Sequence, residues 1–244
     1  MSNPIIGEFL TLPRPGSKIS GRFVCGFGFS PSSNVYKLVM VSIPSKGSDD
    51  EVEVMVLTVG FGIWRSIGTS VYPHWNQSSS GVYLNGLVHW IVGIGPLQAS
   101  RVICAFDVES ERFEELPLPP CSFRLGRAEL ELGVLKGCLT VNVCYKNKIS
   151  VWVMQDYGVK ESWRKEYVIK NKIGRTFHSN PHVPRVLKFT EEGQVLLFFK
   201  HELQAHTLGT RGLVRLEADR MPSVVHGACV HIPSFVSLKD AIAR

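Results

Sequence analysis

Short apolar runs alternate with polar positions along most of the chain, and turn residues interrupt them at short intervals. In GVYLNGLVHWI, two runs rich in β-branched and aromatic residues flank Asn85-Gly86, a dipeptide that suits a two-residue type I′ hairpin because both residues tolerate positive φ. RVICAFD follows, and RFEELPL comes after a polar turn. This pattern predicts four consecutive antiparallel strands and not helices.

The same plan returns along the chain at a nearly constant spacing. Trp64, Phe113, Trp163 and Leu213 hold equivalent places near the end of each unit, 49, 50 and 50 residues apart, and Phe9 lies in NPIIGEFLTLP, which parallels DVESERFEELPLP. We interpret these five residues as structural repeat anchors and expect Trp64, Phe113 and Trp163 to be buried. The full repeats are predicted at about 20–69, 80–118, 130–169 and 184–217, with an N-terminal strand at 3–13 and C-terminal strands at 224–238.

A four-stranded sheet of this size cannot cover both of its faces alone, so neighbouring sheets must stack, and radial closure protects the sheet edges. The predicted fold class is therefore all-β, a kelch-like β-propeller of four-stranded antiparallel blades that begins inside an incomplete N-terminal blade. We expect one domain over residues 1–244, because no linker interrupts the repeats. The strand around Phe9 would need partners, and we hypothesise that the C-terminal run SVVHGACVHIPSFVSL supplies them by closing the ring.

The two ends of the predicted sheets differ in the length of their connections. With strands a, b, c and d running in alternating directions, the a to b turns are mostly tight, whereas the d to a connections SVYPHWNQSSS, PPCSFRLGRAE and NKIGRTFHSNPHVPR are long. Long loops on a rigid scaffold commonly carry function, and aromatic and Arg residues dominate protein interfaces. The candidate partner-binding residues are Tyr72, His74, Trp75, Phe123, Arg124, Arg127, Arg175, Phe177, His178, His182 and Arg185.

Trp75 is the strongest single candidate of that set. The alternative is that loop aromatics fold back between the blades while the arginines are only solvated. Several arginines on one face also suggest a target that is acidic or phosphorylated, because guanidinium groups pair bidentately with carboxylates and phosphates. Asp49-Asp50-Glu51, in a b to c loop of the same face, partly opposes that hypothesis.

Eight segments in order resemble the F-box associated domain of plant F-box proteins, a kelch-like propeller region. They are NPIIGEFLTLP, GFGFSPSSNVYKLVMV, EVMVLTVGFGIWRSIG, GVYLNGLVHWI, ICAFDVESERFEELPLP, LGVLKGCLTVNV, ISVWVMQDYGVKESWRKEY and VLKFTEEGQVLLFF. The resemblance implies that the domain holds a target protein for ubiquitination, while an F-box docks on the Skp adaptor of a cullin-RING ligase. The chain shows no F-box segment, so we expect recognition of a target without its delivery.

Composition and sequence pattern say more about the cellular compartment of the protein than about the kind of partner it binds. The net charge of +6 would favour nucleic acid or an acidic protein without specifying either, and the basic residues at 160–175 alternate along a predicted outer strand, which makes nucleic acid an unlikely partner. The N-terminus lacks a signal-peptide pattern, no run of 18 apolar residues occurs, and the six cysteines form no CxxC pair. We expect a cytoplasmic or nuclear protein that does not span a membrane.

No catalytic, cofactor or metal motif stands out. His178 and His182 are four residues apart, but Pro181 disfavours a helix between them and no third ligand is near. The glycine pairs, such as Gly26-Phe27-Gly28, do not open a helix that could hold phosphate, and we interpret them as bulges or turns. We therefore expect a non-enzymatic recognition module of a ubiquitin ligase. The alternatives are a stand-alone interaction scaffold and a propeller glycoside hydrolase, which needs two converging carboxylates.

Overall fold

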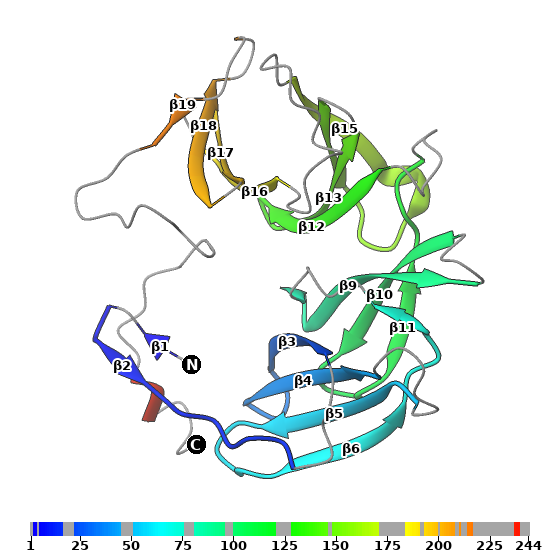
Figure 1. Cartoon of the computed structure of the whole chain (residues 1–244), viewed down its shortest axis with the longest axis vertical. Helices are drawn as coiled ribbons and strands as arrows, with labels where there is room; N and C mark the ends of the chain where they lie inside the picture. Colours follow the sequence, from blue (N-terminus) through cyan, green and yellow to red (C-terminus); the bar gives the residue numbers. More distant parts are fainter. Residues whose placement is uncertain are drawn as a thin grey trace. The chain divides into compact units, whose positions relative to one another are not determined.

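The chain folds almost entirely into β-strands, in four separate antiparallel sheets and one short strand pair (Figure 1). The predicted fold class is confirmed as all-β with four-stranded antiparallel sheets, consistent with a propeller. The structure is a computed structural model, and it describes residues 2–3, 5–16, 22–44, 51–75, 81–95, 100–120, 128–145, 148–170, 184–190, 193–199, 201–207, 210, 214–216 and 237–239.

The chain divides into two compact units, and the organisation of residues 1–244 as one domain stays a prediction. The first comprises residues 1–116 and 232–244, and the second comprises residues 117–231. The boundary falls at the Leu-Pro pair that ends the strand of the anchor Phe113, so it coincides with the end of a repeat. The two units are described separately.

Unit 1 holds two sheets and the short pair of β1 (Ser2–Asn3) with β2 (Glu8–Phe9). Its first sheet has the order β3-β4-β5-β6, and its second has the order β11-β10-β9-β7, with β8 also paired to β9. The strands are β3 (Arg22–Ser30), β4 (Val35–Ile43), β5 (Glu53–Thr58), β6 (Trp64–Thr69), β7 (His74–Trp75), β8 (Val82–Leu84), β9 (Leu87–Ile94), β10 (Ser100–Asp107) and β11 (Phe113–Leu116).

Unit 2 repeats the four-strand plan twice, in the orders β12-β13-β14-β15 and β16-β17-β18-β19. A single-turn 3₁₀ helix, η3 (Lys160–Ser162), leads into β15. The strands are β12 (Glu129–Leu135), β13 (Cys138–Tyr145), β14 (Lys148–Met154), β15 (Trp163–Lys170), β16 (Arg185–Phe189), β17 (Gln194–Phe199), β18 (Glu202–Thr207) and β19 (Val214–Arg215).

The hairpins predicted from sequence have the expected backbone. Asn85 and Gly86 have φ of 53° and 84°, and Lys136 and Gly137 have φ of 49° and 77°. Each pair of positive φ values fits the type I′ turn, whose twist matches that of the flanking strands. The register follows, with Leu84 opposite Leu87 and Leu135 opposite Cys138.

The core of unit 1 lies between its two sheets. Alternate residues of the central strands, such as Val39 and Val56 in one sheet and Val88 and Trp90 in the other, are fully buried in one cluster. A Cβ placed on Gly26 would lie 2.4 Å from side-chain atoms of both Val88 and Trp90. Gly26 therefore lies inside β3 to make room for Trp90, and the interpretation of Gly26-Phe27-Gly28 as a bulge or turn is wrong.

Two repeat anchors make the same hydrogen bond. The indole Nε1 of Trp64 donates to the carbonyl of Pro13 at 2.9 Å, and Nε1 of Trp163 donates to the carbonyl of Pro117 at 3.0 Å. Each proline follows an earlier anchor, Phe9 or Phe113, by four residues. Each tryptophan therefore ties its strand to the end of the preceding repeat.

Burial of the anchors is less uniform than we expected. Trp163 is buried at 3% exposure, whereas Trp64 and Phe113 are only partly buried, and Leu213 lies outside the described residues. The assignment of Phe9 as a repeat anchor stays a prediction, and its side chain is 80% exposed. The reason is that β2 pairs only with the two-residue β1 among the described strands, so no sheet covers the ring.

The N-terminal strand contacts the C-terminal segment through the side chain of Glu8. Among the described residues, no C-terminal strand pairs with it. The carboxylate of Glu8 accepts hydrogen bonds from Oγ of Ser237, at 3.0 Å to each oxygen, and from the backbone N–H of Leu238 at 2.6 Å. The two ends of the chain therefore meet within unit 1. Of the strands predicted at 224–238, residues 224–236 lie outside the described residues.

Candidate functional site

An open pocket lies at one end of the first sheet of unit 1. It is formed where β4 ends, β5 begins and the chain leaves β6, which is the end that carries the b to c and d to a connections. Its volume is about 440 Å³, within the range of ligand-binding pockets, although it is broadly open to solvent. The lining residues are Ile43, Pro44, Glu51, Val52, Thr69, Ser70, Val71 and Pro73.

The wall made by residues 70–73 is fixed from below by two buried aromatic side chains. Tyr72 and Trp75 both belong to the core cluster of unit 1. Nε1 of Trp75 donates to the carbonyl of Tyr72 at 2.9 Å, and the indole packs edge-on against Trp90 with ring centroids 5.6 Å apart. Tyr72 and Trp75 point inward, whereas the two neighbours of Tyr72 in the sequence, Val71 and Pro73, face solvent.

The hydroxyl of Ser70 completes this anchoring. Its Oγ accepts hydrogen bonds from the backbone N–H of Tyr72 at 3.1 Å and from Nε1 of Trp75 at 3.3 Å. The backbone N–H of Ser70 donates to the carbonyl of Val52 at 2.7 Å, which ties the loop to the start of β5. The pocket wall is therefore set by hydrogen bonds and core packing, a preorganised arrangement for binding.

Two aromatic residues of the first d to a connection, predicted from the sequence to bind a partner, are buried in the structure. Tyr72 and Trp75 take the alternative position, folded back into the core. His74 is partly buried, and β7 pairs with β9, with His74 opposite Gly93 and Trp75 opposite Val92. The segment expected to be one irregular loop thus contains a short strand, because residues 74–75 extend the edge of the second sheet.

Arg185 is the one nominated arginine within the described residues, and it is already paired. Its Nε donates to Oε1 of Glu131 at 2.9 Å, in unit 2. Glu131 is buried, and burial raises the pKa of its carboxyl above the ordinary value although Arg185 pulls it down. Arg185 therefore compensates a buried carboxylate. The remaining nominated residues, Phe123, Arg124, Arg127, Arg175, Phe177, His178 and His182, lie outside the described residues.

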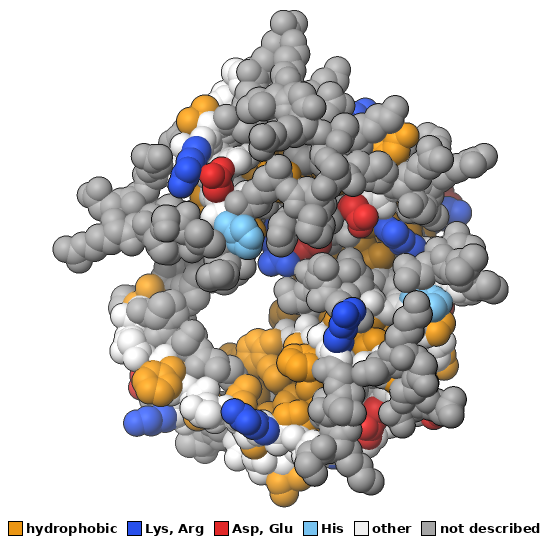
Figure 2. Space-filling view, viewed as in Figure 1, with side chains coloured by type: hydrophobic (Ala, Val, Ile, Leu, Met, Phe, Trp, Pro, Cys, Tyr) orange, Lys and Arg blue, Asp and Glu red, His pale blue; other side chains and the backbone are white. Residues whose placement is uncertain are grey.

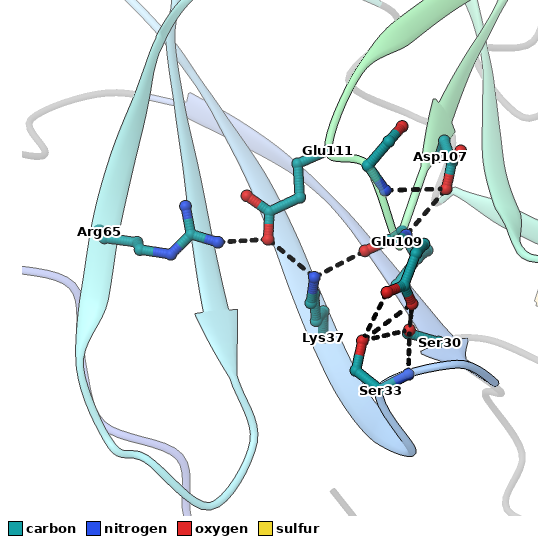
Figure 3. A network of polar contacts seen from close by, with 9 residues as sticks. Ser30, Ser33, Lys37, Arg65, Asp107, Glu109 and Glu111 are labelled. Atoms are coloured by element: carbon teal, nitrogen blue, oxygen red, sulfur yellow. Dashed lines mark hydrogen bonds and ion pairs between the residues drawn. The ribbon is translucent and has the colours of Figure 1, made fainter.

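A polar network that the sequence did not predict joins the two sheets of unit 1 (Figure 3). Nζ of the buried Lys37 donates to Oε1 of Glu111 and to the carbonyl of Val108, both at 2.8 Å, and Arg65 forms a second ion pair with Glu111. Burial tends to raise the pKa of the Glu111 carboxyl, but the hydrogen bonds and charges of Arg65 and Lys37 outweigh it, so the pKa lies below its usual value.

The same turn contacts the β3–β4 hairpin of the first sheet. The carboxylate of Glu109 accepts hydrogen bonds from the hydroxyls of Ser30 and Ser33, and Oδ1 of Asp107 accepts the backbone N–H of Glu109 at 2.8 Å (Figure 3). In the sequence, Glu109-Ser110-Glu111 reads only as a polar turn. The pairing depends on which sheet lies opposite it, and no local pattern encodes that.

Exposed apolar side chains also occur on β3, an edge strand of the first sheet. Hydrophobic side chains gather over the region of β3 and β4 (Figure 2), and the more exposed members of β3 include Phe23 and Phe27. Phe27 stacks on Tyr36 with ring planes 1° apart. The ring of Phe27 is therefore partly covered by its own sheet.

The described residues hold little that could support covalent or metal chemistry. Within the described ranges, no group of three or more His, Cys, Asp or Glu residues is placed to hold a metal ion. Burial raises the pKa of the thiols of Cys104 and Cys144, which disfavours the nucleophilic thiolate. No helix among the same residues is long and apolar enough to cross a membrane.

Comparison with known proteins identifies the family of this chain. The model of the F-box associated beta propeller domain matches residues 1–208. The chain is 33% identical over 235 residues to the F-box protein At3g07870 of Arabidopsis thaliana, covering 81% of this chain and 55% of that protein. It is 32% identical over 146 residues to the F-box/kelch-repeat protein At3g23880 of the same plant, covering 57% and 38% respectively. The chain thus spans about half the length, or less, of these relatives.

Among solved structures, the chain is similar to Zg3597, a family 117 glycoside hydrolase of the marine bacterium Zobellia galactanivorans. The TM-score is 0.45 at 11% identity, over 84% of this chain and 74% of that one, a likeness too weak to bear on function. The family match covers most of the residues whose pattern predicted repeated four-stranded sheets, and the observed sheets agree with it. The chain belongs to the F-box associated β-propeller domain family.

Proposed function

We propose that this chain is the target-recognition module of a Skp–cullin–F-box ubiquitin ligase. The observation that carries the proposal is the family match over residues 1–208, supported by relatives that are named F-box proteins. In such a ligase one part of the receptor binds the adaptor and another binds the protein to be modified. An open, preorganised pocket carried by the packed sheets of unit 1 suits the second task.

The role is non-catalytic in this proposal, and the partner is a protein bound through the b to c and d to a connections. The Skp adaptor would be engaged only through an F-box. The working compartment is the cytoplasm or the nucleus. A stand-alone interaction scaffold is the alternative that differs in outcome, because its partners would not be degraded.

The charge of the target is a separate part of the proposal. An acidic or phosphorylated segment would pair with Arg124, Arg127 and Arg175, since Arg185 is occupied by Glu131. Reversing the charge of the three arginines together is expected to weaken capture of the target. Unchanged capture by that triple variant would refute the acidic-target proposal without touching the recognition role.

The test of the recognition role uses tagged chain 1–244 as bait in plant cells, with and without an inhibitor of cullin activation. We expect at least one retained protein whose abundance rises when the cullins are inhibited. Recombinant 1–244 should not retain a Skp adaptor, whereas a fusion that carries an F-box should. Retained partners with unchanged abundance would favour the scaffold, and the absence of any specific partner would refute the recognition role.

A further inference from the structure

The open pocket of the first sheet has a lining with a definite chemical bias. Of its eight described lining residues, five are apolar, namely Ile43, Pro44, Val52, Val71 and Pro73. Val71 is 82% exposed, although the aromatic residue beside it in the sequence, Tyr72, is buried. An aliphatic side chain held in water beside other apolar residues gains free energy when a partner covers it.

The rim of the pocket carries one carboxylate and no basic residue among its described lining. Glu51 is exposed and forms no hydrogen bond or ion pair with the other described residues. Arg22 begins the adjacent strand opposite Ile43 and already has an interaction partner. The charge of Glu51 is therefore available to an incoming group, and its sign is opposite to the net charge of +6 of the whole chain.

The pocket wall is also fixed before any partner arrives. Tyr72 and Trp75 are buried on either side of Pro73, and Ser70 donates its backbone N–H to Val52. Binding would thus order few groups on this side, which lowers the entropic cost of association. Proline at two wall positions, Pro44 and Pro73, restricts the backbone further.

The geometry points to a protein segment that places an apolar side chain against Val71 and Val52, and a Lys or Arg within two residues of it against Glu51. In an extended segment, residues two apart project to the same side about 7 Å from each other, so one peptide can supply both groups. This inference rests on the proposed recognition function and specifies its partner. It concerns different residues from the arginines of the acidic-target proposal.

The probe for this pocket is a library of random peptides displayed on phage and panned on purified chain 1–244. Enriched sequences should combine Leu, Ile, Val, Met or Phe with Lys or Arg within two positions. Labelled peptides made from them are then titrated by fluorescence anisotropy. We expect Val71→Asp to weaken binding at least about tenfold, because it places a charge in the apolar wall.

Charge exchange tests the polar half of the pocket. Glu51→Lys should weaken the same peptides about fivefold or more, and peptides in which the Lys or Arg is replaced by Glu should regain affinity for that variant. Matched controls are Ile63→Asp, which alters a 75% exposed aliphatic residue at the opposite end of β6, and Glu114→Lys on the exposed face of β11. Neither control should change peptide affinity.

Three outcomes would overturn the inference: no enriched sequence on the wild-type chain, enriched sequences without the apolar and basic pair, or equal binding to the wild type, Val71→Asp and Glu51→Lys. Urea unfolding of each variant verifies that the chain remains folded, as expected for exposed positions. If a cellular target is captured equally by wild type and pocket variants, the recognition role stands and the pocket assignment fails. If neither the wild type nor any variant captures a target, the recognition role itself fails.

Discussion

Trp75 offers the sharpest test of the structure, because sequence and structure assign it opposite roles. A surface contact residue could be truncated with loss of binding alone. In the structure the indole is 6% exposed, packs edge-on against Trp90 and Phe113, and donates its N–H to the carbonyl of Tyr72. Trp75→Ala should therefore reduce the free energy of unfolding.

The magnitude follows from the buried area and from the contacts. A buried Trp removes about 200 Å² from water, which is worth about 5 kcal/mol at about 25 cal/mol per Å², and the remaining Ala methyl recovers part of it. Substitutions of this type in cores cost about 3–5 kcal/mol, including the cavity that remains. Trp75→Phe keeps a ring but loses the N–H donor, so it should cost about 1–2 kcal/mol.

Urea unfolding followed by far-ultraviolet circular dichroism measures the effect. With an m-value of about 2 kcal/mol per M, Trp75→Ala should lower the unfolding midpoint by about 1.5–2.5 M. Trp64→Ala serves as the comparison and should cost less, because Trp64 is only partly buried. A Trp75→Ala chain that unfolds at the wild-type urea concentration yet no longer binds its partner would refute the core assignment and restore the surface role.

Four further predictions follow from the same contacts. Glu111→Gln should destabilise the chain by about 1–3 kcal/mol above pH 5. Because the pKa of Glu111 is lowered in the folded chain, the extra stability of the wild type is full above the pKa of the unfolded carboxyl and should vanish as the pH falls through the pKa of the folded one. Urea titrations from pH 6 to pH 3 measure this loss. Gly26→Ala should cost about 1–3 kcal/mol, because its methyl would overlap Trp90 and Val88, whereas Gly16→Ala, with no heavy atom within 4 Å, should be nearly neutral in thermal unfolding. Asn142→Leu should raise the unfolding free energy by about 1 kcal/mol, because both polar atoms of this buried amide lack partners in the structure; a loss of stability would mean that the amide is satisfied by water or a ligand. Cys104 and Cys144 should react with a thiol reagent at pH 8 only after denaturant is added, and rapid labelling of the native chain would contradict their burial.

The sequence by itself determined the local architecture. Alternation of apolar and polar residues defines strands because side chains point to opposite faces in turn. Asn85-Gly86 defines a hairpin because Asn-Gly is one of the few dipeptides that accept two positive φ values, and Gly137 marks the hairpin at Lys136-Gly137. The spacing of Trp64, Phe113 and Trp163 predicted the repeat, because equivalent positions in successive sheets are separated by the number of residues in one four-stranded unit. The strand and hairpin signals are short in range, and the structure contains the strands and the hairpins that they predict.

Which side chains meet across sheets was decided only by the tertiary structure. Trp75 and Tyr72 have the composition of interface residues, but the core between two sheets had a place for them, and burial of aromatic area outweighs exposure. Lys37 forms an ion pair with Glu111, and Arg185 forms one with Glu131, and the partners are at least 54 residues apart in the sequence. Such pairings depend on the packing of whole sheets, so the sequence located the face that carries the pocket, whereas only the fold revealed that Val71 and Glu51, and not Trp75, line it.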